Sequence, residues 1–466
     1  MQVNTEIKFG TDGWRGVISD NFTFANVRRV ARAIADYYNQ SSRGKKVKMA
    51  VGFDTRFLSG EYALAVSEVL ADNGIEVTLS DRALPTPALS FAVVKRKLTS
   101  GVMITASHNP AEYNGIKIKT ASGGAAGVGV TDKVEKLICK PLSSKGKKDR
   151  IRKTDLTKDY VKFLRGYIDL KKLKNAKFKV LVDAMHGSGN GFMAKVLAGT
   201  GIKLEFLRAD VNPSFDGLRP EPVLENLAPT IERMKRETFD LGLVLDGDAD
   251  RIAAFAGKGE FIPPQKILGL LALHLFQDRG MKGGVVKTIV GTNMMDNIAA
   301  GLGLKLYETP VGFKYISNLM DTQNILVGGE EAGGMGFKGY IPERDGTLAG
   351  ILLLEMMAYR GRPMIKILFD MEKRFGRYYY LRQDLKIPNL KINLNNFKKI
   401  KSILGKKVVW VKDYDGIKLI CSDGSWLMFR GSGTEPIMRV YAESKSLEKS
   451  KRILLFGRQL ILKNAL

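Results

Sequence analysis

The chain has 466 residues, too many for one hydrophobic core, so we expect three or four domains. Its 44% hydrophobic and 26% charged residues are typical of a soluble globular protein. The formal net charge of +26 would suit nucleic acid. However, the lysine-rich stretches carry no aromatic interleaving and no helix-turn-helix pattern, which leaves nonspecific backbone binding at most.

Three sequence features indicate a cytoplasmic protein. The first residues lack the basic start and apolar block of a secretion signal. The most apolar run, Leu268–Phe276, is far too short to span a bilayer. Cys139 and Cys421 have no metal-ligand spacing and are typical of ordinary thiols in a reducing compartment.

The first chemically informative segment is Thr105-Ala-Ser-His-Asn-Pro110. Gly101–Ile104 before it is predicted to be a short buried strand, and Pro110 prevents that strand from continuing. Ligands of open α/β sheets bind at the carboxyl ends of strands. Ser107, with His108 beside it and Lys117 shortly after, therefore suits a nucleophile among cations. Because Ser, Asn and Pro are also common turn residues, an ordinary turn is equally compatible with this segment.

A second segment, Asp246-Gly-Asp-Ala-Asp-Arg251, also follows an apolar strand, predicted at Leu241–Leu245. Three carboxylates on alternate residues would repel one another without a cation among them. Oxygen ligands of this kind favour Mg²⁺ or Ca²⁺ over zinc. The segment lacks the twelfth-position carboxylate of an EF-hand, and a few carboxylates plus a phosphate are typical of Mg²⁺. A solvated acidic turn is the weaker alternative.

Two further loops carry polar groups. Gly328–Gly334 places two glutamates after the predicted strand Asn324–Val327, where carboxylates could accept hydrogen bonds from sugar hydroxyls. Arg430–Pro436 combines an arginine, hydroxyls and glycine-rich backbone, which together suit a phosphate. Taken alone, each is also compatible with a plain turn or connector.

A faint internal repeat predicts the architecture. Segments 70–77, 197–204 and 299–306 share a pattern in which an apolar helix ends at a glycine and an alternating strand begins. Gly74, Gly201 and Gly303 are placed where left-handed helix caps are needed. Three such copies predict three similar mixed α/β domains, delivering Ser107, the aspartates and Glu330 in turn.

The remainder of the chain is predicted to differ from the repeats. Short β-rich runs at 378–381, 407–411, 416–421, 426–429 and 437–441, then a helix at 447–462, predict an α+β domain with an antiparallel sheet. Composition changes place the domains at 1–150, 151–258, 259–372 and 373–466.

Taken together, the four loops resemble those of the α-D-phosphohexomutases. Thr105–Pro110 is similar to that family's phosphoserine loop, Asp246–Arg251 to its metal loop, Gly329–Gly334 to its sugar loop, and Arg430–Pro436 to its phosphate loop. They occur in the family's order, and the similarity extends from Phe9-Gly-Thr-Asp-Gly-Trp-Arg-Gly16 to the last strand. The resemblance implies that the four domains surround a central cleft.

The resemblance also implies roles for the loop residues. Ser107 would carry a phosphate, and Asp246, Asp248 and Asp250 would bind Mg²⁺ together with the phosphoserine oxygen. Arg251 would contact the same phosphate. Lys117 would be a general base with a lowered pKa, or would simply neutralise phosphate. His108 would orient Ser107 or exchange protons.

The implied reaction moves phosphate between C1 and C6 of a hexose through a 1,6-bisphosphate, with glucose 1,6-bisphosphate as activator. A set of residues would bind the hexose phosphate: Arg15, Lys287, Lys314, Glu330, Ala332, Arg430, Ser432, Gly433 and Thr434. Ala332 replaces a serine of many members, and Phe313 favours glucose phosphate over mannose phosphate. A phosphoglucosamine mutase and a non-catalytic sugar-phosphate-binding protein are the alternatives. The sequence does not indicate the oligomeric state, and the positive field would attract sugar phosphates.

Overall fold

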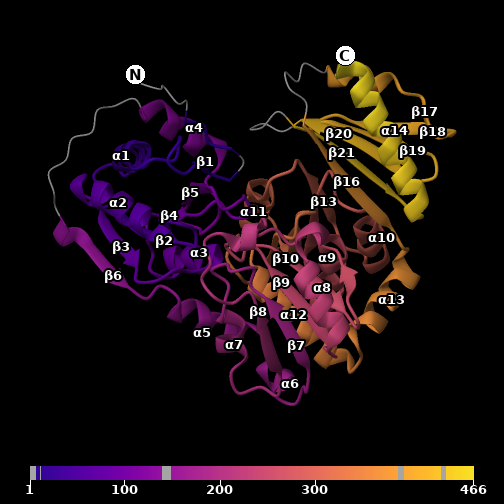
Figure 1. The fold of residues 1–466 in the computed structure, drawn as a ribbon, viewed down its shortest axis with the longest axis horizontal. Coiled ribbons are helices and arrows are strands. Elements are labelled where there is room, and N and C mark those ends of the chain that lie inside the picture. The colour runs from indigo at the N-terminus through magenta and orange to yellow at the C-terminus, as the bar shows by residue number, and fades with distance from the viewer. Residues whose placement is uncertain (1–6, 11, 139–147, 387–392, 432–436, 466) are drawn as a thin grey trace.

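The computed structural model describes residues 7–10, 12–138, 148–386, 393–431 and 437–465. Within them the chain forms four sheets, one for each region of Figure 1 from the indigo N-terminal part to the yellow C-terminal part. The first and fourth regions lie at opposite upper ends of the molecule, and the second and third lie between and below them. Three mixed α/β units followed by an antiparallel α+β unit confirm the predicted fold class.

The first sheet has the order β1-β5-β4-β2-β3-β6. Its strands are β1 (Trp14–Val17), β2 (Lys48–Phe53), β3 (Glu76–Ser80), β4 (Ser100–Ile104), β5 (Tyr113–Lys119) and β6 (Ile151–Thr154). Its helices are α1 (Phe24–Ser41), α2 (Ser59–Asp72), α3 (Thr86–Lys95) and α4 (Val128–Leu137). Residues 151–154 were expected to open the second domain, but as β6 they pair in parallel with β3 of the first sheet.

The second sheet has the order β11-β10-β9-β7-β8. It comprises β7 (Lys179–Asp183), β8 (Lys203–Leu207), β9 (Leu241–Leu245), β10 (Ile252–Ala256) and β11 (Glu260–Ile262), with α5 (Lys158–Tyr167), α6 (Leu170–Lys174), α7 (Phe192–Leu197) and α8 (Ala228–Arg236). The third sheet, β13-β12-β14-β15, comprises β12 (Gly284–Thr288), β13 (Leu306–Thr309), β14 (Ile325–Gly329) and β15 (Met335–Phe337). Its helices are α9 (Pro264–Leu273), α10 (Asn293–Leu302), α11 (Phe313–Thr322), α12 (Gly346–Arg360) and α13 (Met364–Phe375).

The fourth sheet has the order β16-β21-β20-β19-β18-β17, and all its neighbouring strands are antiparallel. It comprises β16 (Tyr379–Lys386), β17 (Ser402–Ile403), β18 (Lys406–Lys412), β19 (Ile417–Cys421), β20 (Trp426–Gly431) and β21 (Ile437–Ser444), followed by α14 (Leu447–Ala465). Five short turns complete the elements: η1 (Lys148–Arg150), η2 (Phe215–Gly217), η3 (Leu224–Asn226), η4 (His274–Asp278) and η5 (Leu394–Lys399).

The internal repeat is visible in the strand order of the first three sheets. In each, one strand pairs in parallel with an inner neighbour and antiparallel with the strand that follows it in sequence, as β4 does with β2 and β5. The equivalent strands are β9, between β7 and β10, and β14, between β12 and β15. The loops that follow β4, β9 and β14 are the three predicted to carry chemistry. Each therefore leaves its sheet at the same topological position.

The predicted glycine caps are confirmed at two positions and wrong at the third. Gly74 and Gly303 have φ of 85° and 65°, as a left-handed cap requires. In the second repeat, Gly199 adopts that conformation instead, with φ of 82°. Gly201 serves a different purpose, because a Cβ on it would lie 2.5 Å from the carbonyl oxygen of Ala176.

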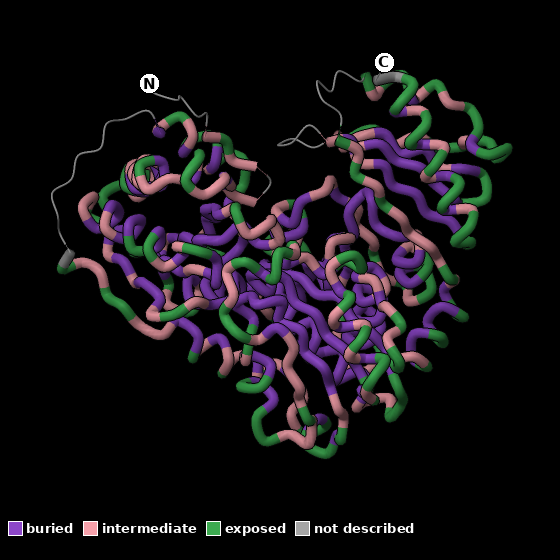
Figure 2. The backbone as a smooth tube through the Cα atoms, viewed as in Figure 1, coloured by how far each residue is buried: buried purple, intermediate pink, exposed green. Residues whose placement is uncertain are grey.

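The buried residues concentrate in the central strands and in the helices between the sheets (Figure 2). One continuous apolar cluster includes residues of the first three units, such as Leu89, Leu243 and Leu352, whereas the fourth sheet has a separate cluster around Leu419 and Phe429. Among the described residues no helix is both long and apolar enough to cross a membrane. The first three loops thus emerge from a shared core.

The fourth unit contacts the third through a small mixed interface. Trp426 packs with Ile289 and Val290, and the Lys418 ammonium lies 4.0 Å from the Trp426 ring centroid. The Lys418 Nζ donates a hydrogen bond of 2.7 Å to the Ile289 carbonyl oxygen. Burial lowers the pKa of Lys418 to about 7.

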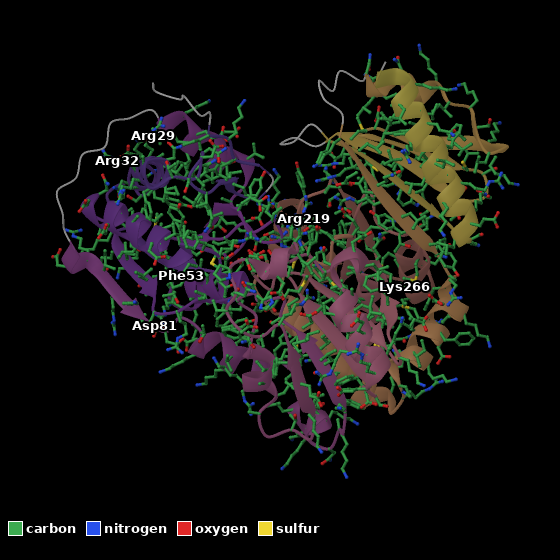
Figure 3. The ribbon with its side chains drawn as sticks, in the orientation of Figure 1. Arg29, Arg32, Phe53, Asp81, Arg219 and Lys266 are labelled. Carbon is green, nitrogen blue, oxygen red and sulfur yellow. The ribbon has the colours of Figure 1, made fainter. Side chains whose placement is uncertain are left out.

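Side chains ending in nitrogen project all around the molecular outline in Figure 3, as the net charge of +26 suggests.

Candidate active site

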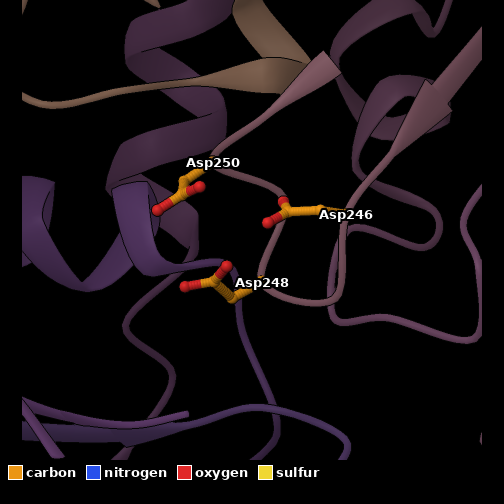
Figure 4. Close-up of side chains that lie close together, drawn as sticks. All are labelled: Asp246, Asp248 and Asp250. Atoms are coloured by element: carbon orange, nitrogen blue, oxygen red, sulfur yellow. The ribbon is translucent and has the colours of Figure 1, made fainter. Parts of the chain in front are cut away.

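The three aspartates of the β9–β10 loop lie together and are fully buried (Figure 4). One carboxylate oxygen from each of Asp246, Asp248 and Asp250 lies within 4.8 Å of the others. Asp248 Oδ1 and Asp250 Oδ1 have no hydrogen-bond partner although both are buried. Burial, with repulsion from the other two carboxylates, raises the pKa of Asp246 well above its ordinary value. Oxygen donors left in this state fit a hard divalent cation.

Ser107 lies directly beside this group. Its hydroxyl donates a hydrogen bond of 2.8 Å to Asp246 Oδ2, and the residue is 1% exposed. Ser107 has φ of 52°, in the left-handed region that non-glycine residues rarely adopt, and its amide donates to Thr105 Oγ1. The β4–β5 loop therefore holds the serine in a strained conformation that aims its hydroxyl at the metal loop.

Arg56 anchors the backbone of the serine loop. Its guanidinium donates hydrogen bonds to four backbone carbonyl oxygens of that loop and its exit, those of residues 107, 109, 110 and 113. The guanidinium carbon also lies 5.0 Å from the ring centroid of Phe215, in the second unit. Arg56 was not predicted from the sequence, since an arginine after a strand has many ordinary roles.

Lys117 projects from β5 into the aspartates and is 1% exposed. Its Nζ lies 2.8 Å from Asp248 Oδ2, 3.1 Å from Asp250 Oδ2 and 3.1 Å from Asp12 Oδ2. Burial disfavours the ammonium, but the three carboxylates outweigh burial and raise the pKa of Lys117. The lowered pKa expected of a general base is thus not found in the metal-free protein.

His108 and the two arginines near it surround the serine. His108 Nδ1 is buried without a hydrogen-bond partner, and burial with the charges of Arg251 and Arg15 lowers the pKa of this imidazole well below its usual value. Arg15 Nη1 donates to Asn109 Oδ1 at 2.6 Å. Arg251 lies 3.8 Å from Asp250 and 3.6 Å from Glu221. The structure therefore brings these predicted residues together around Ser107.

The sugar loop, between β14 and β15, contacts the metal loop directly. The Ile252 amide donates to the Gly333 carbonyl oxygen at 3.1 Å, and Gly333 has φ of 100°. Glu330 is 8% exposed, and its Oε2 accepts a hydrogen bond of 3.1 Å from Arg344 Nη1. Ala332 is partly exposed on the same loop.

Two further predicted binding residues, Lys314 and Lys287, lie in the third unit. Lys314 lies in the first turn of α11 and is partly buried, and burial lowers its pKa despite nearby Asp132. Lys287 on β12 is 2% exposed and pairs with Asp296 and, at 3.8 Å, with Glu308. The Lys287 ammonium is thus already occupied by carboxylates of its own unit.

The phosphate loop is described only at its start. Arg430, at the end of β20, donates from Nε to Asp415 Oδ1 at 2.9 Å and pairs across the sheet with Arg439. Ser432, Gly433 and Thr434 lie outside the described residues.

Sequence reasoning missed Asp12 and Arg344. Asp12 lies within the quoted Phe9–Gly16 segment but received no role, and the two cationic neighbours Lys117 and Lys119 help hold its pKa far below the usual value against burial. Arg344 stands between Glu343 and Asp345, where a charged turn is the ordinary interpretation. Only its three-dimensional contacts single it out.

Comparisons with known proteins agree with this arrangement. Three family models match: phosphoglucomutase/phosphomannomutase alpha/beta/alpha domain I at residues 6–144, domain II at 158–259 and domain III at 263–375. A phosphoglucomutase/phosphomannomutase of Thermococcus kodakarensis is 31% identical, covering 97% of this chain and 98% of the relative. A phosphoglucosamine/phosphogalactosamine mutase of Sulfurisphaera tokodaii is 31% identical over 94% of this chain and 95% of the relative.

A solved structure shows the same fold over the whole chain. The crystal structure of a candidate phosphomannomutase from Thermus thermophilus is 34% identical, with a TM-score of 0.88, covering 98% of this chain and 99% of the other. With this coverage and three matching domain models, the chain belongs to the phosphoglucomutase/phosphomannomutase family of α-D-phosphohexomutases.

Proposed function

We propose that the protein interconverts hexose 1-phosphate and hexose 6-phosphate through a phosphoserine at Ser107 and a hexose 1,6-bisphosphate. The observation that carries this proposal is the hydrogen bond between the Ser107 hydroxyl and Asp246, inside a buried carboxylate group with two unpartnered oxygens. A plain binding protein has no need of a strained serine beside such a group. The similarity to mutases over nearly the whole chain supports the same reaction.

The donor set fits Mg²⁺. Asp246, Asp248 and Asp250 would hold it together with an oxygen of the phosphoserine. When bound, Mg²⁺ supplies Lewis-acid stabilisation of the charge that builds on the transferred phosphoryl group. Phosphoryl transfer requires in-line positioning and charge neutralisation, and Arg251 and Lys117 are placed to supply cationic charge at this group.

The reaction consists of two transfers. In the first, a sugar hydroxyl oxygen bonds to phosphorus as the bond from phosphorus to Ser107 Oγ breaks, and the hydroxyl proton passes to a base. In the second, after the bisphosphate has turned over, Ser107 Oγ gives up its proton and bonds to the phosphorus of the other phosphate. The bond from that phosphorus to the sugar oxygen breaks, and the sugar oxygen takes up a proton from the same base. Arg430 and the loop after it hold the non-reacting phosphate, and Glu330 accepts from hydroxyls in both orientations.

The two predicted proton carriers differ in the structure. Lys117 is held in its charged form by three carboxylates and suits charge neutralisation. His108 has an open Nδ1 on the serine loop, but burial and the charges of Arg251 and Arg15 lower the pKa of its imidazole and make it a weak proton acceptor, so His108 better suits orienting Ser107.

Glucose phosphate is the proposed first substrate and mannose phosphate the second. Phe313 is buried beside Gly336 of β15, and Ala332 removes one hydroxyl contact that a serine would offer. Glucosamine phosphate is the alternative, supported by the name of the Sulfurisphaera relative. The ratio of kcat/KM among the three sugar phosphates decides between them. A reducing cytoplasm remains the proposed compartment, and glucose 1,6-bisphosphate the proposed activator.

The test is a coupled assay of glucose 6-phosphate formation from glucose 1-phosphate, with Mg²⁺ and a trace of glucose 1,6-bisphosphate. Ser107→Ala should abolish turnover, whereas Ser67→Ala, a buried serine on α2 that donates to the Ala63 carbonyl oxygen, should leave it unchanged. Chelation of Mg²⁺ should also stop the reaction, and adding it back should restore it. Release of inorganic phosphate without isomerisation would instead indicate a phosphatase.

A further inference from the structure

Arg344, in the loop between β15 and α12, contacts carboxylates from three separate segments. Its Nη2 lies 2.6 Å from Asp250 Oδ2 in the metal loop, and Nη1 lies 3.1 Å from Glu330 Oε2 in the sugar loop. Nη2 also pairs with Asp12 near the N-terminus. The side chain is 5% exposed, so these contacts are made away from water. One buried cation therefore joins the predicted metal ligand to the predicted sugar ligand.

The backbone of the sugar loop packs closely against the Arg344 side chain. A Cβ on Gly334, in the sugar loop, would lie 2.1 Å from Arg344 Cδ. The guanidinium carbon lies 5.5 Å from the ring centroid of Phe313. Directly after Arg344, the Gly346 amide donates to the Ala249 carbonyl oxygen of the metal loop at 3.0 Å. The sugar loop and the metal loop thus both pack against Arg344 or the residues next to it.

The two oxygens of the Asp250 carboxylate differ in their hydrogen bonds. Asp250 Oδ2 accepts from Arg344 and Lys117, whereas Asp250 Oδ1 has no hydrogen-bond partner. Arg344 and Lys117 therefore restrain the Asp250 carboxylate through Oδ2 and leave Oδ1 open to a cation. Arg344 restrains Glu330 in the same way through Oε2. A lysine would present a single ammonium and could not hold both groups with a planar fork.

We propose that Arg344 is a positioning residue that couples the sugar loop to the metal loop, so that hexose phosphate and Mg²⁺ each raise the affinity of the other. The proposal rests on the proposed function, because it assigns the sugar to Glu330 and the cation to the aspartates. Sugar hydroxyls that donate to Glu330 restrict the motion of its carboxylate. The Arg344 guanidinium, which binds both carboxylates, then restricts the motion of the Asp250 carboxylate as well. Because linkage is reciprocal, one coupling factor describes both directions.

The test measures Mg²⁺ affinity by titration calorimetry on unphosphorylated protein, with and without saturating glucose 6-phosphate. The wild type should bind Mg²⁺ at least about fivefold more tightly with the sugar phosphate present, the lower end of ordinary coupling. Arg344→Gln and Arg344→Lys should bring that ratio close to one. The matched control is Arg360→Gln at the end of α12, where Arg360 pairs with Asp278 at 3.0 Å outside the site. It should keep the wild-type ratio.

Two results would overturn the inference: a wild-type ratio of one, or an unchanged ratio in both Arg344 variants. Coupling through direct contact between the sugar phosphate and Mg²⁺ would survive the substitutions and keep the ratio at its wild-type value, so the comparison separates that route from coupling through Arg344. If Arg344→Gln does not fold, Arg344→Lys and Glu330→Gln, alone and combined, give the same answer, since non-additive effects are expected of coupled partners. No turnover is measured, so a protein that couples the two ligands but lacks mutase activity would refute the proposed function alone.

Discussion

Gly247 allows the metal loop to approach the serine loop closely, and adding one methyl group there should slow the reaction without removing any catalytic group. A Cβ on Gly247 would lie 2.5 Å from the Ser107 carbonyl oxygen and 3.2 Å from Pro220 Cγ. The first contact is with backbone and cannot be relieved by rotating a side chain. In Gly247→Ala the two loops must therefore move apart by about 1 Å, and a displacement of that size at reacting groups costs about 100-fold in rate.

We expect the kcat of Gly247→Ala to fall about 100-fold, which corresponds to about 2.7 kcal/mol in the barrier. The KM for glucose 1-phosphate should change little, because the sugar and its distal phosphate are assigned to other loops. The assay is the coupled formation of glucose 6-phosphate at saturating Mg²⁺. Gly166→Ala on α5 is the matched control, since a Cβ there meets no atom within 4 Å. Folded Gly247→Ala protein with wild-type kcat would refute the view that this close approach sets the reacting geometry.

Three further outcomes are expected. Burial and the two neighbouring carboxylates raise the pKa of Asp246, so the affinity for Mg²⁺ should fall as the pH drops through that pKa. Mg²⁺ binding should also release a proton, which calorimetry in buffers of different ionisation enthalpy would detect. An affinity that does not change with pH would contradict this. Glu343 forms a buried ion pair with Lys119, and Glu343→Gln removes the negative partner while the Lys119 ammonium stays buried. The free energy of unfolding, measured by urea titration, should fall by about 3 kcal/mol. Wild-type stability would contradict this. Because the pKa of Lys418 is lowered to about 7, the unfolded chain binds more protons above that pH. Wild-type stability should rise by about 2 kcal/mol from pH 7 to pH 9, and Lys418→Met should flatten the rise; an equal rise in that variant would exclude Lys418 as the cause.

The loops with chemistry were predictable because each couples an apolar strand to an unusual polar sequence. Leu241–Leu245 is followed by three aspartates, and Gly101–Ile104 is followed within three residues by Ser107, so strand polarity placed both loops at the ends of strands, and the four loops in order carried the resemblance. The repeated strand order of the sheets follows from the same segments. Gly201 was predicted wrongly because a glycine that ends a helix and a glycine that permits close backbone approach have the same sequence appearance.

The cations that organise the site were not predictable in the same way. Arg344 contacts Asp12, Asp250 and Glu330, which lie 332, 94 and 14 residues away in the chain. No local period or spacing encodes such a meeting. The sequence left Lys117 either as a general base with a lowered pKa or as a neutralising charge, and the direction of its pKa shift depends on three carboxylates that only the folded chain brings together.

The four hydrogen bonds from Arg56 to the serine loop have a consequence for how this loop can vary. Arg56 binds carbonyl oxygens, which every residue type possesses, and no side chain of residues 107–113 is needed for those contacts. These four contacts therefore do not depend on which side chains the loop displays. Exchanging the side chains of Ala111 and Glu112, which lie within this span, should therefore leave the four hydrogen bonds in place. Arg56 thus anchors the serine loop through main-chain atoms alone, and the identity of the side chains in that span does not enter these four contacts.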